Sequence, residues 1–377
     1  MAGASPGHDV VVVDEVSMAD LDLFYRLISA INFKHTKLVI IGDPDQLPSV
    51  GAGNVYHDLI ESKVIPEIIL SRVFRYGVGG ISTVCTDIRL GKPYVSKDLK
   101  KPTMIGDDKG FMFIPSSKDN TVKTAISLYK NLLKKGYKPE DILVLSSQNI
   151  GSQGTIVLNR ELQKIANSSN MNGSYIESSE KDKLKRTKYY KNDLVIQTAN
   201  NYKAKRFSSF YMSKEELDMS ENIFIPNGDI GILKDINDFK NKCSVKFDDT
   251  ILYDKNMLNM CMLGYSISIH KSQGGQAKVV ILVTPRSHTH MLTSNILYVG
   301  ASRAQELLFQ IGEPSMLPNI LKKKENLKRN TNLQNLLKKS NQDKTIELYD
   351  KIVEDMIERH NKEQEGLSLK VNEEEIW

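Results

Sequence analysis

An α/β fold built on parallel β-sheets is predicted for this chain from two apolar runs and from the residues that end them. Residues 10–13 are four valines followed by Asp14-Glu15, and residues 38–41 are followed by Gly42-Asp43. Continuous runs rich in β-branched residues are typical of strands buried on both faces of a parallel sheet. Open α/β sheets bind ligands at the carboxyl ends of their strands. The two acidic strand ends therefore define the first candidate site.

The elements next to these two strands can be predicted in chain order. Residues 18–31 place apolar side chains at helical spacing and are expected to cover the first strand. Residues 51–60 lead into a second helix, and the sequence Val64-Ile65-Pro66 marks an expected domain crossing. The segment 68–76 then opens a second α/β region.

The second region carries its own helix and strand signals. Residues 120–135 form an amphipathic pattern that Gly136 should end, and a strand is expected over residues 142–145. Further along, residues 279–284 predict a buried strand and residues 307–311 the last strand.

Residues 189–257 differ in character from the rest. Their short alternating strands are separated by Asn, Asp and Gly turns, as in small all-β modules. Between two of these strands, residues 207–222 predict an extra polar loop or a short helix. The expected strands of the module are 194–198, 231–236, 243–247 and 250–253.

Length and composition limit the classes of protein without choosing one. The 377 residues allow two or three domains, and the net charge of +5 is compatible with a polyanionic partner. The three cysteines form no Cys-x-x-Cys pair, so reduced thiols in a cytoplasmic protein are expected. No stretch is long and apolar enough to predict a membrane span, and no histidine spacing predicts a metal site.

Three side chains at the strand ends have the chemistry of phosphoryl transfer. Asp14 would hold Mg²⁺, directly or through water, and Glu15 would orient and deprotonate the attacking water. Gln46 carries a donor and an acceptor, so it could bond the γ-phosphate of ATP or that water. The alternatives are that the two acids cap the following helix and that Gln46 joins two loops.

Five segments resemble, in order, motifs of RecD-like superfamily-1 helicases. Residues 14–18 and 42–54 resemble motifs II and III, and residues 73–76 (Val-Phe-Arg-Tyr) look like motif IV. Residues 265–274 look like motif V, and residues 297–304 look like motif VI. The resemblance extends over roughly residues 9 to 338.

The resemblance implies RecA-like parallel-sheet motor domains, the first one incomplete, with an inserted SH3-like β-barrel. The implied parts are a partial first motor (1–66), a second motor in two pieces (67–188 and 258–338), the barrel (189–257) and a charged helical tail (339–377). The implied activity is ATP hydrolysis with Mg²⁺ that drives 5′ to 3′ translocation on single-stranded DNA and unwinding at duplex junctions.

Further site residues follow from the same resemblance. Arg75 and Arg303 would stabilise the charge on the transferred phosphoryl group, and Gln276 would contact ATP. Structural ion pairs are the alternative role of the two arginines, and Asn54 could contact DNA or satisfy a turn. The expected DNA-binding residues are Asn54, His270, Lys271, Ser272 and Gln273.

The family's phosphate loop, Gly-x4-Gly-Lys-Ser/Thr, does not occur in this sequence. That loop supplies N–H donors and a Lys to the β- and γ-phosphates. This chain alone is therefore predicted to be inactive, and a phosphate-loop segment in cis or in trans is its expected partner. Truncation, a split gene and loss of catalysis, which would leave a DNA-binding or assembly subunit, remain open. In the tail, residues 328–333 (Lys-Arg-Asn-Thr-x-Leu) resemble a family segment that follows motif VI.

Overall fold

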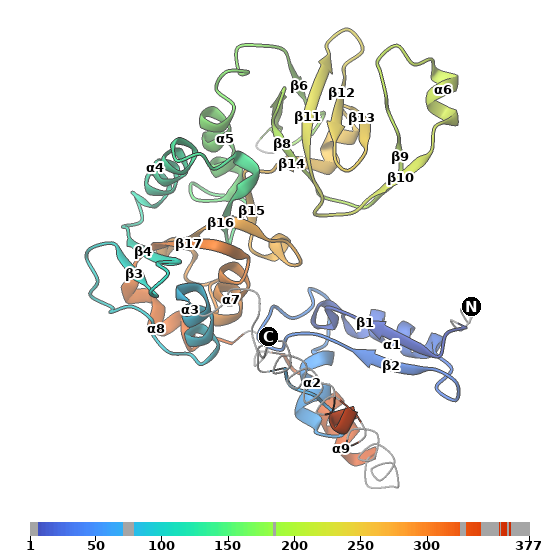
Figure 1. Cartoon of the computed structure of the whole chain (residues 1–377), viewed down its shortest axis with the longest axis vertical. Coiled ribbons are helices and arrows are strands. Elements are labelled where there is room, and N and C mark those ends of the chain that lie inside the picture. Colours follow the sequence, from blue (N-terminus) through green and yellow to red (C-terminus); the bar gives the residue numbers. More distant parts are fainter. Residues whose placement is uncertain are drawn as a thin grey trace, which may run out of the picture. The chain divides into compact units, whose positions relative to one another are not determined.

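The computed structural model describes residues 7–70, 79–183, 186–324 and 329–340, together with 354, 356–359 and 362. Figure 1 shows its elements, coloured along the chain. Residues 1–72 and 324–377 form one compact unit, here called the first unit, and residues 73–323 form the second unit. Arg75 and Lys328 lie outside the described residues, as does most of the predicted tail.

The first unit is built on two parallel strands, β1 (Val10–Val13) and β2 (Lys37–Ile40). The helix α1 (Leu21–Ala30) begins where the Asp20 carboxylate accepts a hydrogen bond from the Leu23 amide at 2.8 Å. The helix α2 (Val55–Ser62) follows β2. The predicted strands and helices of this region are confirmed.

The expectation that both strands are buried on both faces is wrong. Val10 and Val12 are 49% and 57% exposed, and Val39 is also exposed. The small core of the unit lies instead among Val16, α1 and α2, with Val13 and Ile40 packed at its edge. In the described part of the unit the sheet has only two strands, and the exposed valines show that one of its faces is open.

The second unit contains a six-stranded sheet, in which all neighbouring strands are parallel except at one edge. Neighbouring parallel strands in this sheet are not consecutive in the chain, so crossover connections that contain helices join them. The sheet contains the strands predicted near residues 142–145, 279–284 and 307–311, and these predictions are confirmed. In spatial order the strands are β15 (Ser266–Ser268), β5 (Ile142–Ser146), β16 (Ala277–Thr284), β17 (Ala304–Gly312), β4 (Phe111–Pro115) and the antiparallel β3 (Thr103–Ile105).

Helices pack on both faces of this sheet, as Figure 1 shows. The pair α4 (Thr121–Lys134) and α5 (Thr155–Ala166) covers one face, and α3 (Gly80–Arg89) with α7 (Ser294–Ala301) covers the other. A short helix, α8 (Leu317–Leu321), follows the last strand. The predicted helix over residues 120–135 is α4, and Gly136 follows it in the left-handed region at φ 98°.

The region predicted as an all-β module is an antiparallel sheet with added ribbons. The strand order is β13-β12-β11-β8-β14, and within the described residues the ladder does not close into a barrel. The polar excursion predicted at residues 207–222 contains a short helix. The elements are β6 (Tyr175–Glu177), β7 (Lys188–Tyr190), β8 (Leu194–Gln197), β9 (Asn201–Lys205), α6 (Lys214–Met219), β10 (Asn222–Ile225), β11 (Ile230–Asn237), β12 (Lys242–Lys246), β13 (Thr250–Asp254) and β14 (Cys261–Leu263).

The chain returns to the first unit after the second. The helix α9 (Leu333–Ser340) packs on α2 through Leu333 and Leu337. In Figure 1 these two helices lie side by side. Residues 258–338 were expected in the second motor, but residues 329–338 make their contacts in the first unit. Among the described residues, no helix has the length and apolar character needed to cross a membrane.

Candidate functional site

Backbone pairing brings the two acidic strand ends of the first unit together. Beyond the strands, the Ile41 amide donates to the Val13 carbonyl at 2.8 Å, and the Val16 amide donates to the Ile41 carbonyl at 3.0 Å. Ile41 therefore bonds the residues on both sides of Asp14 and Glu15, which keeps the acidic pair beside the end of β2. As expected from the sequence, the acids and the Gln46 loop emerge at one edge of the sheet.

Asp14 and Glu15 do not cap the following α-helix, because Asp20 does so. Asp14 is exposed, and its Oδ1 accepts a hydrogen bond from the Glu15 amide at 2.8 Å. Glu15 adopts left-handed backbone angles, φ 53° and ψ 37°. A left-handed conformation is uncommon for a residue with a side chain, and such strain clusters at functional sites. No hydrogen-bond partner of the Glu15 carboxylate occurs among the described residues, which leaves it available to a ligand.

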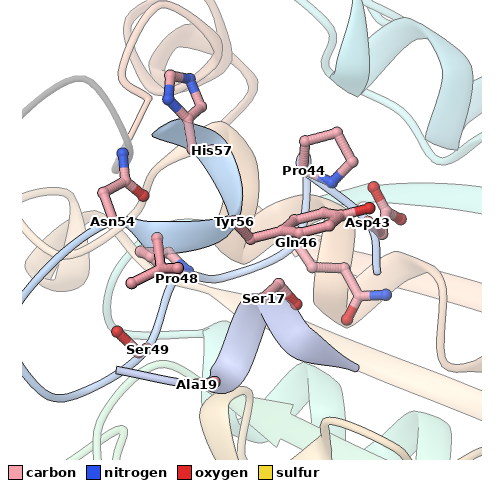
Figure 2. A pocket seen from close by; sticks show the side chains of 11 residues that line it. Ser17, Ala19, Asp43, Pro44, Gln46, Pro48, Ser49, Asn54, Tyr56 and His57 are labelled. Carbon is pink, nitrogen blue, oxygen red and sulfur yellow. The ribbon is translucent and has the colours of Figure 1, made fainter. Parts of the chain in front are cut away.

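Gln46 sits in a tight turn directly after β2. The Asp45 amide bonds the Asp43 carboxylate at 3.0 Å, and the Gln46 amide bonds the Asp43 carbonyl at 3.1 Å. The Gln46 side chain is buried and lines a hollow together with Ser17 and Tyr56, as Figure 2 shows. The turn thus places the side-chain amide of Gln46 in the same hollow as Ser17, which follows the Asp-Glu pair in the chain.

Tyr56 fixes one wall of that hollow. Its hydroxyl donates to the Gly42 carbonyl at 2.8 Å. Burial, and then the negative charge of Asp43, raise the pKa of Tyr56, so the phenol remains a protonated donor. Across the hollow, the Ser17 hydroxyl is buried and has no hydrogen-bond partner among the residues described.

Asn54, a predicted DNA contact, is 6% exposed and stands at the N-terminus of α2. Its side chain makes no capping hydrogen bond there. Asn54 is thus largely covered at the start of α2, and its contact with DNA stays a prediction.

Arg329 organises the loop before Asn54, and sequence reasoning assigned it no role. Its guanidinium donates to the carbonyls of Gly51 at 2.8 Å and Gly53 at 2.5 Å, and to the hydroxyl of Ser49 at 3.3 Å. It also bonds the Ser49 carbonyl. The only available signal was the place of Arg329 in the Lys-Arg-Asn-Thr segment.

Two neighbouring polar contacts extend this anchor. The Thr331 hydroxyl donates to the Asp58 carboxylate at 2.7 Å, and the Gln334 amide donates to the Glu61 carbonyl at 3.0 Å. Residues 329–340 therefore hold the loop and α2 through both hydrogen bonds and apolar packing.

The predicted DNA-binding residues of the second unit form a short 3₁₀ turn, His270–Ser272, directly after β15. His270 is exposed, whereas the buried Ser272 hydroxyl bonds the Ile269 carbonyl at 2.7 Å. Burial lowers the pKa of Lys271, whose side chain is partly covered. The Gln273 side-chain nitrogen is buried without a hydrogen-bond partner among the described residues. Ser272 thus shapes the turn, and Lys271 and Gln273 hold donors beside it.

Arg303 is 2% exposed, and acceptors of its own unit take its donors. These acceptors are the carbonyls of Val299 at 3.1 Å and Gly275 at 3.2 Å, and the Ser302 hydroxyl at 2.9 Å. In this conformation Arg303 ties α7 to the segment that follows the 3₁₀ turn. The neighbouring Gln276 is exposed, and its side-chain oxygen accepts from Gln305 at 2.8 Å.

Two family descriptions match separate parts of this chain. Residues 1–105 match the AAA domain family, and residues 263–310 match the UvrD-like helicase C-terminal domain. The first match covers the Asp-Glu strand and the Gln46 loop, and the second covers the 3₁₀ turn and Arg303.

Curated relatives match about four fifths of the chain. The RecBCD enzyme subunit RecD of Mycolicibacterium smegmatis is 25% identical over 318 residues, which are 81% of this chain and 50% of that protein. The ATP-dependent RecD2 DNA helicase of Deinococcus radiodurans is 24% identical over 311 residues, 82% of this chain and 37% of that protein. This chain is therefore similar to RecD-like DNA helicases over most of its length, and it spans about half of the length of these relatives or less.

Solved structures of helicases also align with this chain. Pif1 helicase from Bacteroides, in complex with ADP-AlF3 and ssDNA, aligns at a TM-score of 0.43 and 17% identity over 81% of this chain and 70% of that one. Pif1 from Candida albicans aligns at 0.43 and 18% identity over 82% and 74%. The sequence relatives, rather than these structures, carry the family assignment.

Proposed function

We propose that this chain functions within an ATP-dependent DNA helicase that moves 5′ to 3′ on single-stranded DNA. The observation that carries the proposal is the shared strand edge of the first unit. There the Asp14-Glu15 pair and the turn of Gln46 emerge side by side, and the Glu15 carboxylate is available. A pure binding module would have no use for this arrangement.

The side chains at that edge fit nucleotide-borne Mg²⁺. No group of three or more His, Cys, Asp or Glu that could hold a metal occurs in the described part of the chain. Mg²⁺ usually uses one or two carboxylates and completes its shell with water and substrate phosphates, so the exposed Asp14 suffices. The ion, when bound, would neutralise charge on the phosphates. Glu15 would take the proton of the attacking water, and Gln46 would orient that water.

The proposal includes a phosphate-loop segment supplied in cis or in trans. The exposed apolar residues of β1 and β2 support it, because a parallel sheet is normally covered on both faces. A split helicase, with the phosphate loop on another polypeptide, is the second candidate, and the same exposed face favours it. Arg75 and Arg303 would stabilise the transferred phosphoryl group, Arg303 after leaving its present acceptors. Gln276 would contact the nucleotide.

Phosphate release, measured with and without single-stranded DNA, tests the proposal. We expect none from the purified chain, and DNA-stimulated release once a phosphate-loop segment of a RecD-like relative is fused or added. Glu15→Gln, which cannot accept the proton, should abolish the restored release. Release by the chain alone that Glu15→Gln removes would refute the need for the loop. DNA binding without release in any combination would support the non-catalytic subunit.

A further inference from the structure

A buried carboxylate, Asp193, lies where the β-module joins the sheet of the second unit. The residue is fully buried, and four donors surround it. Its Oδ2 accepts from the Gln163 side chain at 2.6 Å and the Tyr190 amide at 2.7 Å. Its Oδ1 accepts from the Asn167 side chain at 2.7 Å and the Tyr265 hydroxyl at 2.8 Å. Burial raises the pKa of Asp193, whereas the four donated hydrogen bonds oppose that shift, so the arrangement of donors suits the ionised carboxylate.

The four donors come from three separate segments. Tyr190 belongs to the strand β7 through which the chain enters the module, and Tyr265 stands where the chain leaves it. Gln163 lies on α5, and Asn167 directly follows that helix at its C-cap. Through these hydrogen bonds, Asp193 connects the segments by which the chain enters and leaves the β-module to α5, a helix that packs on the six-stranded sheet.

A third residue on the same face of α5 continues this row. Asn159 and Gln163 are four residues apart on α5, so their side chains share a helix face, and Asn167 follows at the same spacing at the C-cap. All three side chains are buried. The Asn159 side chain both donates to the Ser266 carbonyl at 2.7 Å and accepts from the Ser266 amide at 2.8 Å. Side chains of this helix thus hydrogen-bond both the first residue of β15 and Asp193.

The strand β15 ends beside the 3₁₀ turn that holds His270, Lys271 and Gln273. Ser266–Ser268 pairs with β5, and the Ile269 amide donates to the Ser146 carbonyl at 3.0 Å. Backbone hydrogen bonds therefore hold the segment between Tyr265 and the turn. We infer that Asp193 is a positioning residue that makes the β-module, α5 and the 270–273 turn respond as one body when single-stranded DNA binds. This inference rests on the proposed DNA contact of that turn.

Two substitutions separate coupling from folding. Asp193→Asn keeps the shape but presents an amide nitrogen to two donors, while Tyr265→Phe removes a single donor. The matched control is Asp235→Asn, which changes an exposed acid of the same module that pairs with Lys191 at 2.9 Å. All variants are made in the full chain.

Hydrogen exchange of the chain without DNA tests the positioning directly. In Asp193→Asn we expect exchange in residues 266–273 to accelerate about tenfold or more, because charged hydrogen bonds are lost, and in Tyr265→Phe by less. Exchange in β12 and β13 should stay unchanged in both. Unchanged exchange in residues 266–273 overturns the inference, and so does an equal acceleration in β12 and β13, which would mark Asp193 as a general fold determinant.

Affinity for a fluorescein-labelled oligothymidylate completes the test. We expect Asp193→Asn to bind about tenfold more weakly than the wild type and Asp235→Asn to bind equally well. A wild-type chain that does not bind would refute the DNA contact of the proposed function, and the exchange result would still decide the role of Asp193. Wild-type affinity in Asp193→Asn overturns the coupling.

Discussion

Replacing Arg329 with alanine should release the loop that precedes α2. The substitution removes every donor that the side chain supplies to the carbonyls of Ser49, Gly51 and Gly53 and to the Ser49 hydroxyl. These acceptors lie within residues 49–53, a stretch of five residues that contains two glycines, and Gly53 has a φ of 98°. A loop of this composition has high conformational entropy without an anchor.

The size of the effect follows from the kind of bonds lost. A hydrogen bond from a charged donor contributes about 1.5–3 kcal/mol. The four bonds share one guanidinium and water can replace part of each, so we expect a total of about 2–3 kcal/mol rather than their sum. That corresponds to a roughly 30- to 150-fold increase in the opening of the loop and of the first turn of α2.

Hydrogen exchange of the amides of α2 measures this opening. Arg329→Lys should recover only part of the protection, because one ammonium cannot reproduce the planar fork of donors. As a control, Arg286→Ala removes an exposed pair with Glu313 at 2.9 Å, and its effect on neighbouring amides should stay below about fivefold. Wild-type exchange of α2 in Arg329→Ala would show that Leu333 and Leu337 hold the segment without the arginine.

Three further outcomes are expected. In an enzyme completed with a phosphate loop, Glu15→Gln should still bind ATP while steady-state hydrolysis falls by about 10²–10⁴-fold, and near-normal turnover would exclude Glu15 as the base. In the same enzyme, Arg303→Lys loses buried hydrogen bonds and should melt at a lower temperature, yet at a temperature where it is still folded it should slow DNA-stimulated hydrolysis by about 10³-fold. Activity that falls only as the variant unfolds would assign Arg303 to the fold. His288 is buried, its Nδ1 lies 3.0 Å from the Ser147 hydroxyl, and burial lowers its pKa from 6.5 to about 4. Because the unfolded chain then binds the proton at a higher pH than the folded chain, stability should fall as the pH drops from 6.5 towards 4. His288→Gln should flatten that part of a curve of unfolding midpoint against pH, and an unchanged slope would contradict the burial argument.

Local patterns in the sequence were sufficient for many elements, among them both strands of the first unit. The valine run became β1, the apolar run at residues 142–145 became β5, and the amphipathic segment before Gly136 became α4. Period and composition determine such elements because the residues that form them are neighbours in the chain. The motif order likewise predicted the relationship to RecD-like helicases. The exposure of Val10 and Val12 could not be predicted, because it depends on what covers the other face of the sheet.

The sequence by itself determined which chemical groups this protein carries, and the tertiary structure decided which of them are available. Asp14 and Glu15 meet the Gln46 turn as expected, because parallel pairing places neighbouring strand ends at one edge. Asn54 and Arg303 are buried, and Arg329 and Asp193 act on partners far away in sequence. No local pattern contains such contacts, since they form only when distant segments pack, and desolvation then fixes which donors and acceptors remain free.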